Sequence, residues 1–342
     1  MVMILRMMIV FAICAVEPAA AGYSVQALGV DAEHDASYAT DINESGAVLC
    51  GSMSASDAAG TFLWSRDTGI VGLTGEGVFS SAGINSNGQT VGLHMYVPFP
   101  GSWLRYELFI RNADGSTTAL PVPDDASDVW PAKIDDAGRV WVDLEYRDPS
   151  GTIKPANSAV ISPDGSVEYI GNTWVHAISN NGTAIIDYRY LRTPQGELSV
   201  LPWLENAGAV DVTCVNDLGW VAGILLGGHV VRWDSAGNML DLGVGFAGGM
   251  NNLGQVVGSM NDRAVMWDVD GSVTELPSLD GRPNSGAGAI NDRGQIAGRA
   301  CAESPSTEVA VLWDPVPEPS ALMTLTCGLV GAGLGARRRS RH

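Results

Sequence analysis

The sequence predicts an all-β fold, a seven-bladed β-propeller with four short strands per blade, over residues 22–315 of the 342-residue chain. The first observation is a five-residue motif that recurs seven times. Its first residue is apolar, its second is usually Asn, its third and fourth vary, and its fifth is Gly. Successive motif glycines lie 35 to 50 residues apart, and a period near 40 is typical of propellers and solenoids. The second is that each copy holds two hairpin signals, enough for one four-stranded blade. The third is an N-terminal segment that matches the strand missing from the last copy.

Residues 1–21 have the features of a secretory signal peptide, which we expect to form a helix. Arg6 gives a short positive start, Met7–Val16 is apolar, and Ala19–Ala21 offers a cleavage site before Gly22. The apolar run is too short for a comfortable membrane span, which needs about 20 residues. The alternative is a buried N-terminal strand or helix.

Each motif copy has the chemistry of a tight hairpin. An Asn at the first turn position bonds its side chain to nearby backbone, and the Gly at the fourth supplies a positive φ. The strands that follow are apolar at successive positions, as in Val48-Leu49 and Val256-Val257, which predicts burial on both faces. The copies start at Ile42, Ile84, Ile134, Ile178, Val215, Met250 and Ile290.

A second hairpin follows in each copy. Its third strand ends in Trp in four copies, at Trp64, Trp233, Trp267 and Trp313. Copies two, three and four carry Arg111, Ile161 and Arg192 at this place. A short fourth strand ending in an apolar residue, usually Leu, comes next, as in Met239–Leu242.

The seventh copy has no fourth strand of its own, because Trp313 is followed directly by a different kind of segment. The mature N-terminus, Val25–Gly29, matches the fourth strand Met239–Gly243. We therefore expect it to complete the last blade beside residues 285–313 and to close the ring, which removes an exposed sheet edge. An open array of the same hairpins is the alternative.

One stretch departs from the repeat pattern and is the candidate ligand surface. Copy two is longer between Gly92 and Arg111, and an acidic stretch leads into the third copy. Aromatic platforms beside carboxylates can bind sugar rings, although the same residues also fill long loops and blade interfaces. The candidate residues are Tyr96, Trp103, Tyr106, Asp124, Asp125 and Trp130.

No motif in the chain identifies a catalytic, cofactor or metal site. Gly243–Gly248 fits GxGxxG but joins two β repeats with no helix after it, which a dinucleotide site requires. The histidines outside the two ends fall in different copies without ligand spacing, and the Asp-Gly pairs are explained by turns. We expect no cofactor, no metal and no catalytic residue.

Charge and cysteine content limit the partners. The chain has a net charge of −19, and removing five basic and two acidic residues at the ends (−19 − 5 + 2) leaves −22 for residues 22–316. Nucleic acid is excluded as a partner, because phosphate binding needs a basic face. Between the ends lie Cys50, Cys214 and Cys301, an odd number. They are either three buried thiols or a Cys50–Cys301 disulfide with one thiol left over.

The last 27 residues have three parts in a fixed order. Residues 316–320 are an extended, proline-containing motif, 321–336 an apolar segment expected to form a transmembrane helix, and 337–342 a basic tail. This resembles the PEP-CTERM sorting signal of Gram-negative bacteria, which implies processing by the membrane enzyme exosortase after transient anchoring. A packed C-terminal helix is the alternative. The residues that carry the resemblance are Val316, Pro317, Glu318, Pro319, Ser320, Arg337, Arg338 and Arg339.

The repeats resemble bacterial extracellular repeats named after a His-Ala-Phe (HAF) tripeptide. Ile290–Gly298 and Val311–Asp314 match that form, whereas the tripeptide itself is absent. The resemblances imply an exported protein of the periplasm, outer surface or extracellular matrix. We expect a non-enzymatic binding or structural propeller, with extracellular polysaccharide as a candidate partner. The alternatives are a propeller glycan hydrolase or lyase, and a matrix element stabilised by divalent cations.

Overall fold

The computed structural model describes residues 22–54, 59–73, 78–96, 105–123, 126–146, 152, 157–171, 173–202, 210–302 and 308–316. The chain forms two compact units. The large unit, Val25–Asp314, contains the repeats, and the small unit contains the two chain ends. Of the small unit the structure describes only residues 22–24 and 315–316, so the expected signal helix, the C-terminal helix and most of the sorting motif lie outside the described residues.

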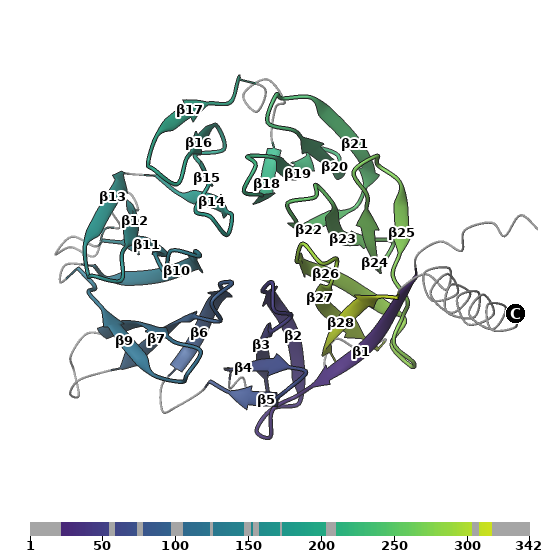
Figure 1. Ribbon diagram of the computed structural model, residues 1–342, viewed down its shortest axis with the longest axis horizontal. Helices are drawn as coiled ribbons and strands as arrows, with labels where there is room; N and C mark the ends of the chain where they lie inside the picture. Colours follow the sequence, from purple (N-terminus) through teal and green to yellow (C-terminus); the bar gives the residue numbers. More distant parts are fainter. Residues whose placement is uncertain are drawn as a thin grey trace, which may run out of the picture. The chain divides into compact units, whose positions relative to one another are not determined.

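Seven four-stranded antiparallel sheets form a ring of blades (Figure 1), as the repeats predict. Blades one and two are β2 (Ala36–Ile42), β3 (Val48–Met53), β4 (Ala59–Ser65), β5 (Gly69–Gly72), and β6 (Val78–Ile84), β7 (Thr90–Tyr96), β8 (Arg105–Arg111), β9 (Thr117–Leu120). Blades three and four are β10 (Asp128–Ile134), β11 (Val140–Glu145), β12 (Asn157–Ile161), β13 (Val167–Gly171), and β14 (Val175–Ile178), β15 (Ala184–Ile186), β16 (Tyr190–Arg192), β17 (Leu198–Val200).

Blades five and six are β18 (Val210–Val215), β19 (Val221–Leu225), β20 (His229–Trp233), β21 (Met239–Val244), and β22 (Phe246–Met250), β23 (Val256–Met260), β24 (Arg263–Trp267), β25 (Val273–Glu275). Blade seven is β26 (Asn284–Ile290), β27 (Ile296–Cys301), β28 (Val309–Pro315) and β1 (Tyr23–Gly29). The first strand of each blade lies nearest the axis of the ring.

The N-terminal strand completes the last blade, which confirms the predicted closure. β1 pairs with β28 in the sheet order β1-β28-β27-β26, and Figure 1 shows the purple β1 beside the yellow β28. Ser37, fully buried in β2, strengthens this junction, because its hydroxyl donates to Gly29 O at 2.6 Å and accepts from Ala310 N at 2.9 Å. One side chain of blade one therefore binds both β1 and β28 of blade seven.

The motif turns have the conformation that their sequence predicts. All seven motif glycines have φ between +74° and +87°, which a residue with a Cβ adopts only with strain. In the first copy, Asn43 Oδ1 accepts from the backbone N of Ser45 and Ala47 at 3.1 and 3.0 Å. Because these bonds are local, the turn can be specified by five residues.

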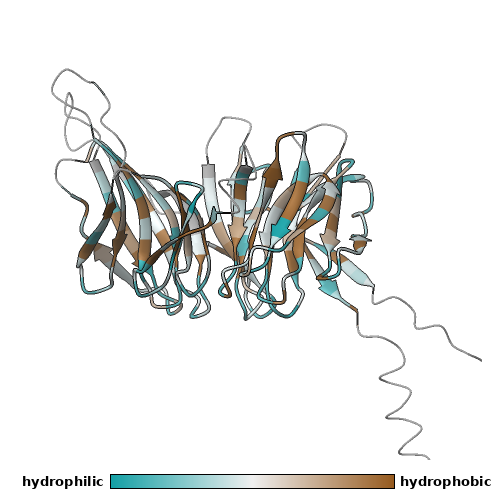
Figure 2. Cartoon of the chain, turned by 90° about the horizontal axis from the view of Figure 1, so that it is seen from above, coloured by the Kyte–Doolittle hydropathy of each residue, from teal (hydrophilic) through white to brown (hydrophobic). Residues whose placement is uncertain are grey.

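The core lies between the blades and uses both faces of the middle strands. The apolar pairs after the turns are buried on successive positions, as predicted, for example Val48 and Leu49. Trp233, Trp267 and Trp313 are also buried, whereas Trp64 is half-buried. Figure 2 shows the ring edge-on, with many hydrophobic residues within strands that run between its two faces.

All three described cysteines are free thiols, so the alternative of a Cys50–Cys301 disulfide is wrong. Cys50 is fully buried in β3, and its burial raises the pKa of the thiol. Burial also raises the pKa of Cys214 to about 11 and that of Cys301 to about 11. Thiols with such raised pKa values stay protonated near neutral pH. Cys50 is a small core residue, whereas Cys214 and Cys301 are half-buried.

Candidate functional site

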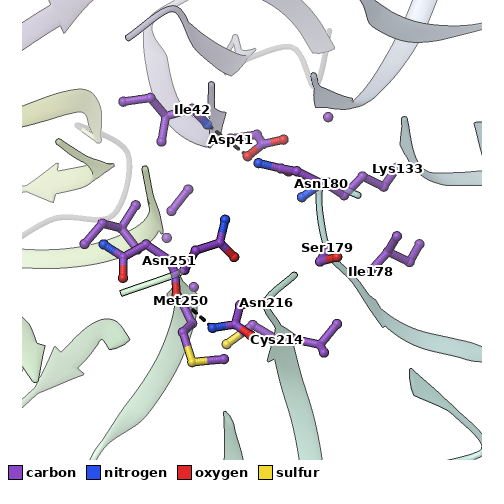
Figure 3. Close-up of a pocket in the computed structure, with 18 of the residues that line it drawn as sticks. Asp41, Ile42, Lys133, Ile178, Ser179, Asn180, Cys214, Asn216, Met250 and Asn251 are labelled. Atoms are coloured by element: carbon purple, nitrogen blue, oxygen red, sulfur yellow. Dashed lines mark hydrogen bonds between the residues drawn. The ribbon is translucent and has the colours of Figure 1, made fainter. Parts of the chain in front are cut away.

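The axis of the ring has two chemically different ends. At one end, here called the turn end, the seven motif turns converge; at the other, the loop end, the first strands begin. A pocket of about 340 Å³ at the turn end is lined by residues of all seven blades. Figure 3 shows side chains from several blades around it, among them Asp41, Lys133, Asn216 and Asn251.

Motif asparagines join neighbouring blades around the turn end. Each Nδ2 donates to the backbone carbonyl of the equivalent residue in the next blade, and we call these bonds the turn-end struts. Figure 3 shows the strut from Asn216 to Asn251 as a dashed line. The struts are Asn43 to Asn85 (3.1 Å), Asn85 to Asp135 (2.9 Å), Asn216 to Asn251 (3.1 Å), Asn251 to Asn291 (3.2 Å) and Asn291 to Asn43 (3.0 Å).

Copies three and four lack the amide at this position and use other bonds. Asp135, fully buried, accepts from Arg139 Nε at 2.7 Å instead of donating. Asp136 N donates to Asn180 O at 2.8 Å, and Asn181 donates to Asp217 from its backbone N at 2.8 Å. The sequence motif therefore has two roles, a turn and a strut, of which the turn alone was predicted.

Acidic side chains at the turn end are also engaged between blades. Asp41 accepts from Ile84 N at 3.0 Å, and Glu44 accepts from Asp292 N at 3.0 Å. Burial raises the pKa of the Glu44 carboxyl, and the nearby negative charge of Asp292 adds to the shift. These two carboxylates accept hydrogen bonds from the backbone of a neighbouring blade, so their role is to stabilise the ring.

The loop end carries exposed aromatic side chains at one level of the first strands. The level is the residue four positions before each motif. In six blades this residue pairs with the fourth residue of the second strand, such as Tyr38 with Gly51 and Phe246 with Ser259. In blade four the residue is Trp174, which lies directly before β14. Trp130, Trp174 and Phe246 are 59%, 50% and 69% exposed, and Tyr38 is half-buried. We call these four residues the aromatic belt. The seven positions are Tyr38, Ser80, Trp130, Trp174, Asp211, Phe246 and Gly286.

A strained turn in blade four supports the belt beside Trp174. Asp187 and Tyr188 have φ of +49° and +55°, uncommon for residues with a Cβ, and Asp187 N donates to Trp174 O at 3.3 Å. The Tyr188 ring stacks on His176 with ring centroids 3.3 Å apart. Burial lowers the pKa of His176 and raises the pKa of Tyr188, so both rings are uncharged at neutral pH.

Of the six candidate ligand residues from the sequence, the structure describes Tyr96, Tyr106 and Trp130, which differ in their contacts. Tyr96 stacks on His94 with ring centroids 5.4 Å apart. The Tyr106 hydroxyl donates to the Asp128 carboxylate of the next blade, a contact of a blade interface. Trp130 belongs to the aromatic belt. Trp103, Asp124 and Asp125 lie outside the described residues.

The described part of the chain contains neither a metal-binding cluster nor a membrane-spanning helix. No group of three or more His, Cys, Asp or Glu side chains there could hold a metal ion. No helix among these residues is long and apolar enough to cross a membrane.

Solved structures with a similar fold include two lyases and a peptidase. A streptogramin B lyase structure is 12% identical with a TM-score of 0.54, and covers 85% of this chain and 97% of that one. The virginiamycin B lyase of Staphylococcus aureus, solved with quinupristin, is 11% identical (TM-score 0.54), covering 86% and 100%. An acylaminoacyl peptidase of Pyrococcus horikoshii is 11% identical (TM-score 0.52), covering 84% of this chain and 54% of that one. Such identities show a shared fold alone.

No protein-family model matches the chain, and no curated protein matches it. Function must therefore be argued from the molecule's own residues. Sequence reasoning singled out Trp130 but missed Tyr38, Trp174 and Phe246. The sequence does contain a signal for them, because all four lie four residues before a motif. That shared position indicates a common surface only once the blades are known to surround one axis.

Proposed function

We propose that the protein is an exported cell-envelope or matrix protein, sorted by exosortase through residues 316–342, whose propeller binds a ligand without catalysing a reaction. The sorting part of the proposal rests on the three-part C-terminal segment. The binding part rests on one observation, the aromatic belt at the loop end. Two of its members, Phe246 and Tyr38, line one hollow at that end, and aromatic side chains that line a hollow are typical of binding sites.

The use of the acidic residues favours binding over glycan hydrolysis or elimination. A glycosidase needs two carboxylates free to protonate and to attack, with pKa values separated by their surroundings. At the turn end, Asp41 and Glu44 are instead occupied by backbone donors of neighbouring blades.

The sorting proposal is tested by mass spectrometry of the full chain produced in an exosortase-containing Gram-negative host and in the same host without the enzyme. We expect the mature form to start at Gly22 and to end near Pro317–Pro319 when exosortase is present. Without exosortase the chain should keep its tail and stay with the membrane fraction.

A matched pair of variants makes the test specific to the motif. Pro317→Ala with Pro319→Ala should block processing, whereas Pro315→Ala, just outside the motif, should leave it unchanged. An intact tail in both hosts, or a chain retained in the cytoplasm, would contradict the proposal.

A further inference from the structure

A hollow of about 780 Å³ lies at the loop end and is lined by residues of blades five, six, seven and one. Two members of the aromatic belt, Phe246 and Tyr38, are among its lining residues, on the first strands of blades six and one. Between them, blade seven has Gly286 at the belt position. The volume is within the range of small-molecule sites, about 300–1,000 Å³.

The glycines that line the hollow are of two kinds. At Gly258 and Gly298 an added Cβ would lie 1.8 and 2.1 Å from a backbone oxygen, so close strand packing requires glycine there. At Gly286 an added Cβ would meet only the Arg299 side chain, at 4.0 Å, and at Gly288 the nearest atom would be 3.6 Å away. Neither Gly286 nor Gly288 has a positive φ. The fold therefore does not need glycine at these two positions, and their lack of side chains keeps the space between Phe246 and Tyr38 open.

Polar groups at the edge of the hollow are fixed by the backbone. Asn261 and Asp262 form a two-residue turn with φ of +52° and +61°, the geometry of a tight hairpin. Asp262 O accepts from Ser285 N at 2.9 Å, which ties this turn to blade seven. The turn thus presents an amide and a carboxylate beside the aromatic wall that Phe246 forms.

The charges around the hollow favour an uncharged ligand. Arg299 and Asp262 are the charged residues among its described lining, one of each sign. The Arg299 guanidinium also lies 3.7 Å from Glu308, so its charge is already paired. An anionic ligand would find no unpaired cation in this lining and would approach a chain of net charge −19.

We infer that this hollow binds a pyranose ring of a neutral polysaccharide, which deepens the proposed binding function and rests on it. The apolar C–H face of a hexose can stack on Phe246, as aromatic faces stack on flat apolar partners. Its hydroxyls can donate to Asp262 and accept from Asn261 and Arg299. Gly286 leaves the room in which the ring lies.

The test measures binding of oligosaccharides to the full chain by isothermal titration calorimetry, in a detergent without a sugar headgroup. The probes are maltohexaose, cellohexaose and laminarihexaose (neutral), hexagalacturonate (anionic) and a chitosan hexamer (cationic). We expect at least one neutral hexamer to bind with a dissociation constant below about 1 mM. The charged hexamers should bind more weakly than that one.

Two variants probe the hollow in opposite ways. Phe246→Ala removes the stacking face, and Gly286→Leu fills the space with a side chain that the backbone tolerates. Each should weaken binding of the neutral hexamer about tenfold or more, with an unchanged melting temperature. Leu253→Ala is the matched control, because Leu253 is 58% exposed in a motif turn at the other end of the axis.

Absence of binding by all neutral hexamers, tighter binding of a charged hexamer, or binding that survives both variants would each overturn the inference. The outcome is separable from the sorting test. If the tail is processed but the sugars do not bind, the inference about the hollow fails alone. If the chain is neither exported nor processed, the proposed location fails whatever the sugars do.

Discussion

Replacing Asn291 by Asp tests the turn-end struts. Asn291 is 2% exposed, and its Nδ2 donates to Asn43 O at 3.0 Å and to Gln295 Oε1 at 2.9 Å. Its Oδ1 accepts from the backbone N of Arg293 and Gln295 at 3.1 and 3.0 Å. The substitution keeps the oxygen that organises the turn and replaces the donating amide by a second oxygen. It therefore separates the strut from the turn.

The expected cost follows from the bonds that are lost. Two donated hydrogen bonds contribute about 0.5–1.5 kcal/mol each, and leaving buried acceptors to face a carboxylate adds about 1–3 kcal/mol. We expect the free energy of unfolding to fall by about 2–6 kcal/mol. For a domain of this size about 1 kcal/mol corresponds to 2–4 °C, so the melting temperature should fall by about 4–24 °C.

The third copy provides the rescue. Asp135 is accommodated there because Arg139, four residues later, donates to it at 2.7 Å. Gln295 stands at the same place relative to Asn291, so adding Gln295→Arg to the Asn291→Asp variant should restore at least half of the lost stability. Gln295→Arg alone is the control, because it also removes the bond from Gln295 to Asp314.

Thermal and guanidinium unfolding at pH 7.5, followed by near-ultraviolet circular dichroism, would measure these differences. A loss below about 0.5 kcal/mol for Asn291→Asp would mean that the strut adds no more than an ordinary surface bond. Failure of the double variant to recover would show that the Asp–Arg pair does not replace the strut. Either result would refute the reasoning.

Three further perturbations have defined outcomes in thermal unfolding. Gly254→Ala should lower the free energy of unfolding by well over about 1 kcal/mol, because φ is +79° and the new Cβ would lie 2.5 Å from the Trp220 ring. Gly69→Ala is the control: it has the φ penalty without a neighbouring atom and should lower the free energy of unfolding by about 1 kcal/mol. Equal losses in the two variants would contradict the packing argument. Deleting residues 23–30 should sharply lower the melting temperature by opening blade seven, and an unchanged melt would disprove the closure. Burial raises the pKa of Glu44 in the folded state, so its contribution to stability is present below the unfolded pKa and is lost as pH rises through the folded pKa. Glu44→Gln should therefore stabilise the protein at pH 7 but not at pH 4. A lower melting temperature of the variant at pH 7 would contradict this direction of the pKa shift.

Much of the fold could be predicted because its signals are short. The turn around Asn43 and Gly46 depends on bonds within five residues, and the same five-residue pattern recurs often enough to count blades. Closure by Val25–Gly29 was predictable for a related reason. A strand is missing at one end and a spare strand of the same pattern is present at the other, and they pair so that the third strand of the last blade is not left as an open edge.

The candidate site was less predictable, as Tyr106 and Trp130 illustrate. Both are aromatic residues near carboxylates in the sequence, yet Tyr106 bonds to Asp128 across a blade interface whereas Trp130 is exposed at the loop end. Composition cannot separate these two outcomes. The difference depends on whether the side chain lies between two blades or beyond the level at which they touch.

The sequence by itself determined the strand content, the number of blades, the turn conformations and the partner of the first strand. The strand content, the number of blades and the turns follow from local hydrogen bonds, from positive φ at glycine and from apolar residues at successive positions, all within one repeat. The partner of the first strand follows from the strand that the last repeat lacks. Tertiary structure alone decided the rest. The struts join equivalent residues 35 to 50 positions apart or, at the ring closure, 248 apart, and the hollow joins Phe246 to Tyr38. Such contacts exist only once seven blades surround a common axis, because no interaction within a single blade brings these side chains together.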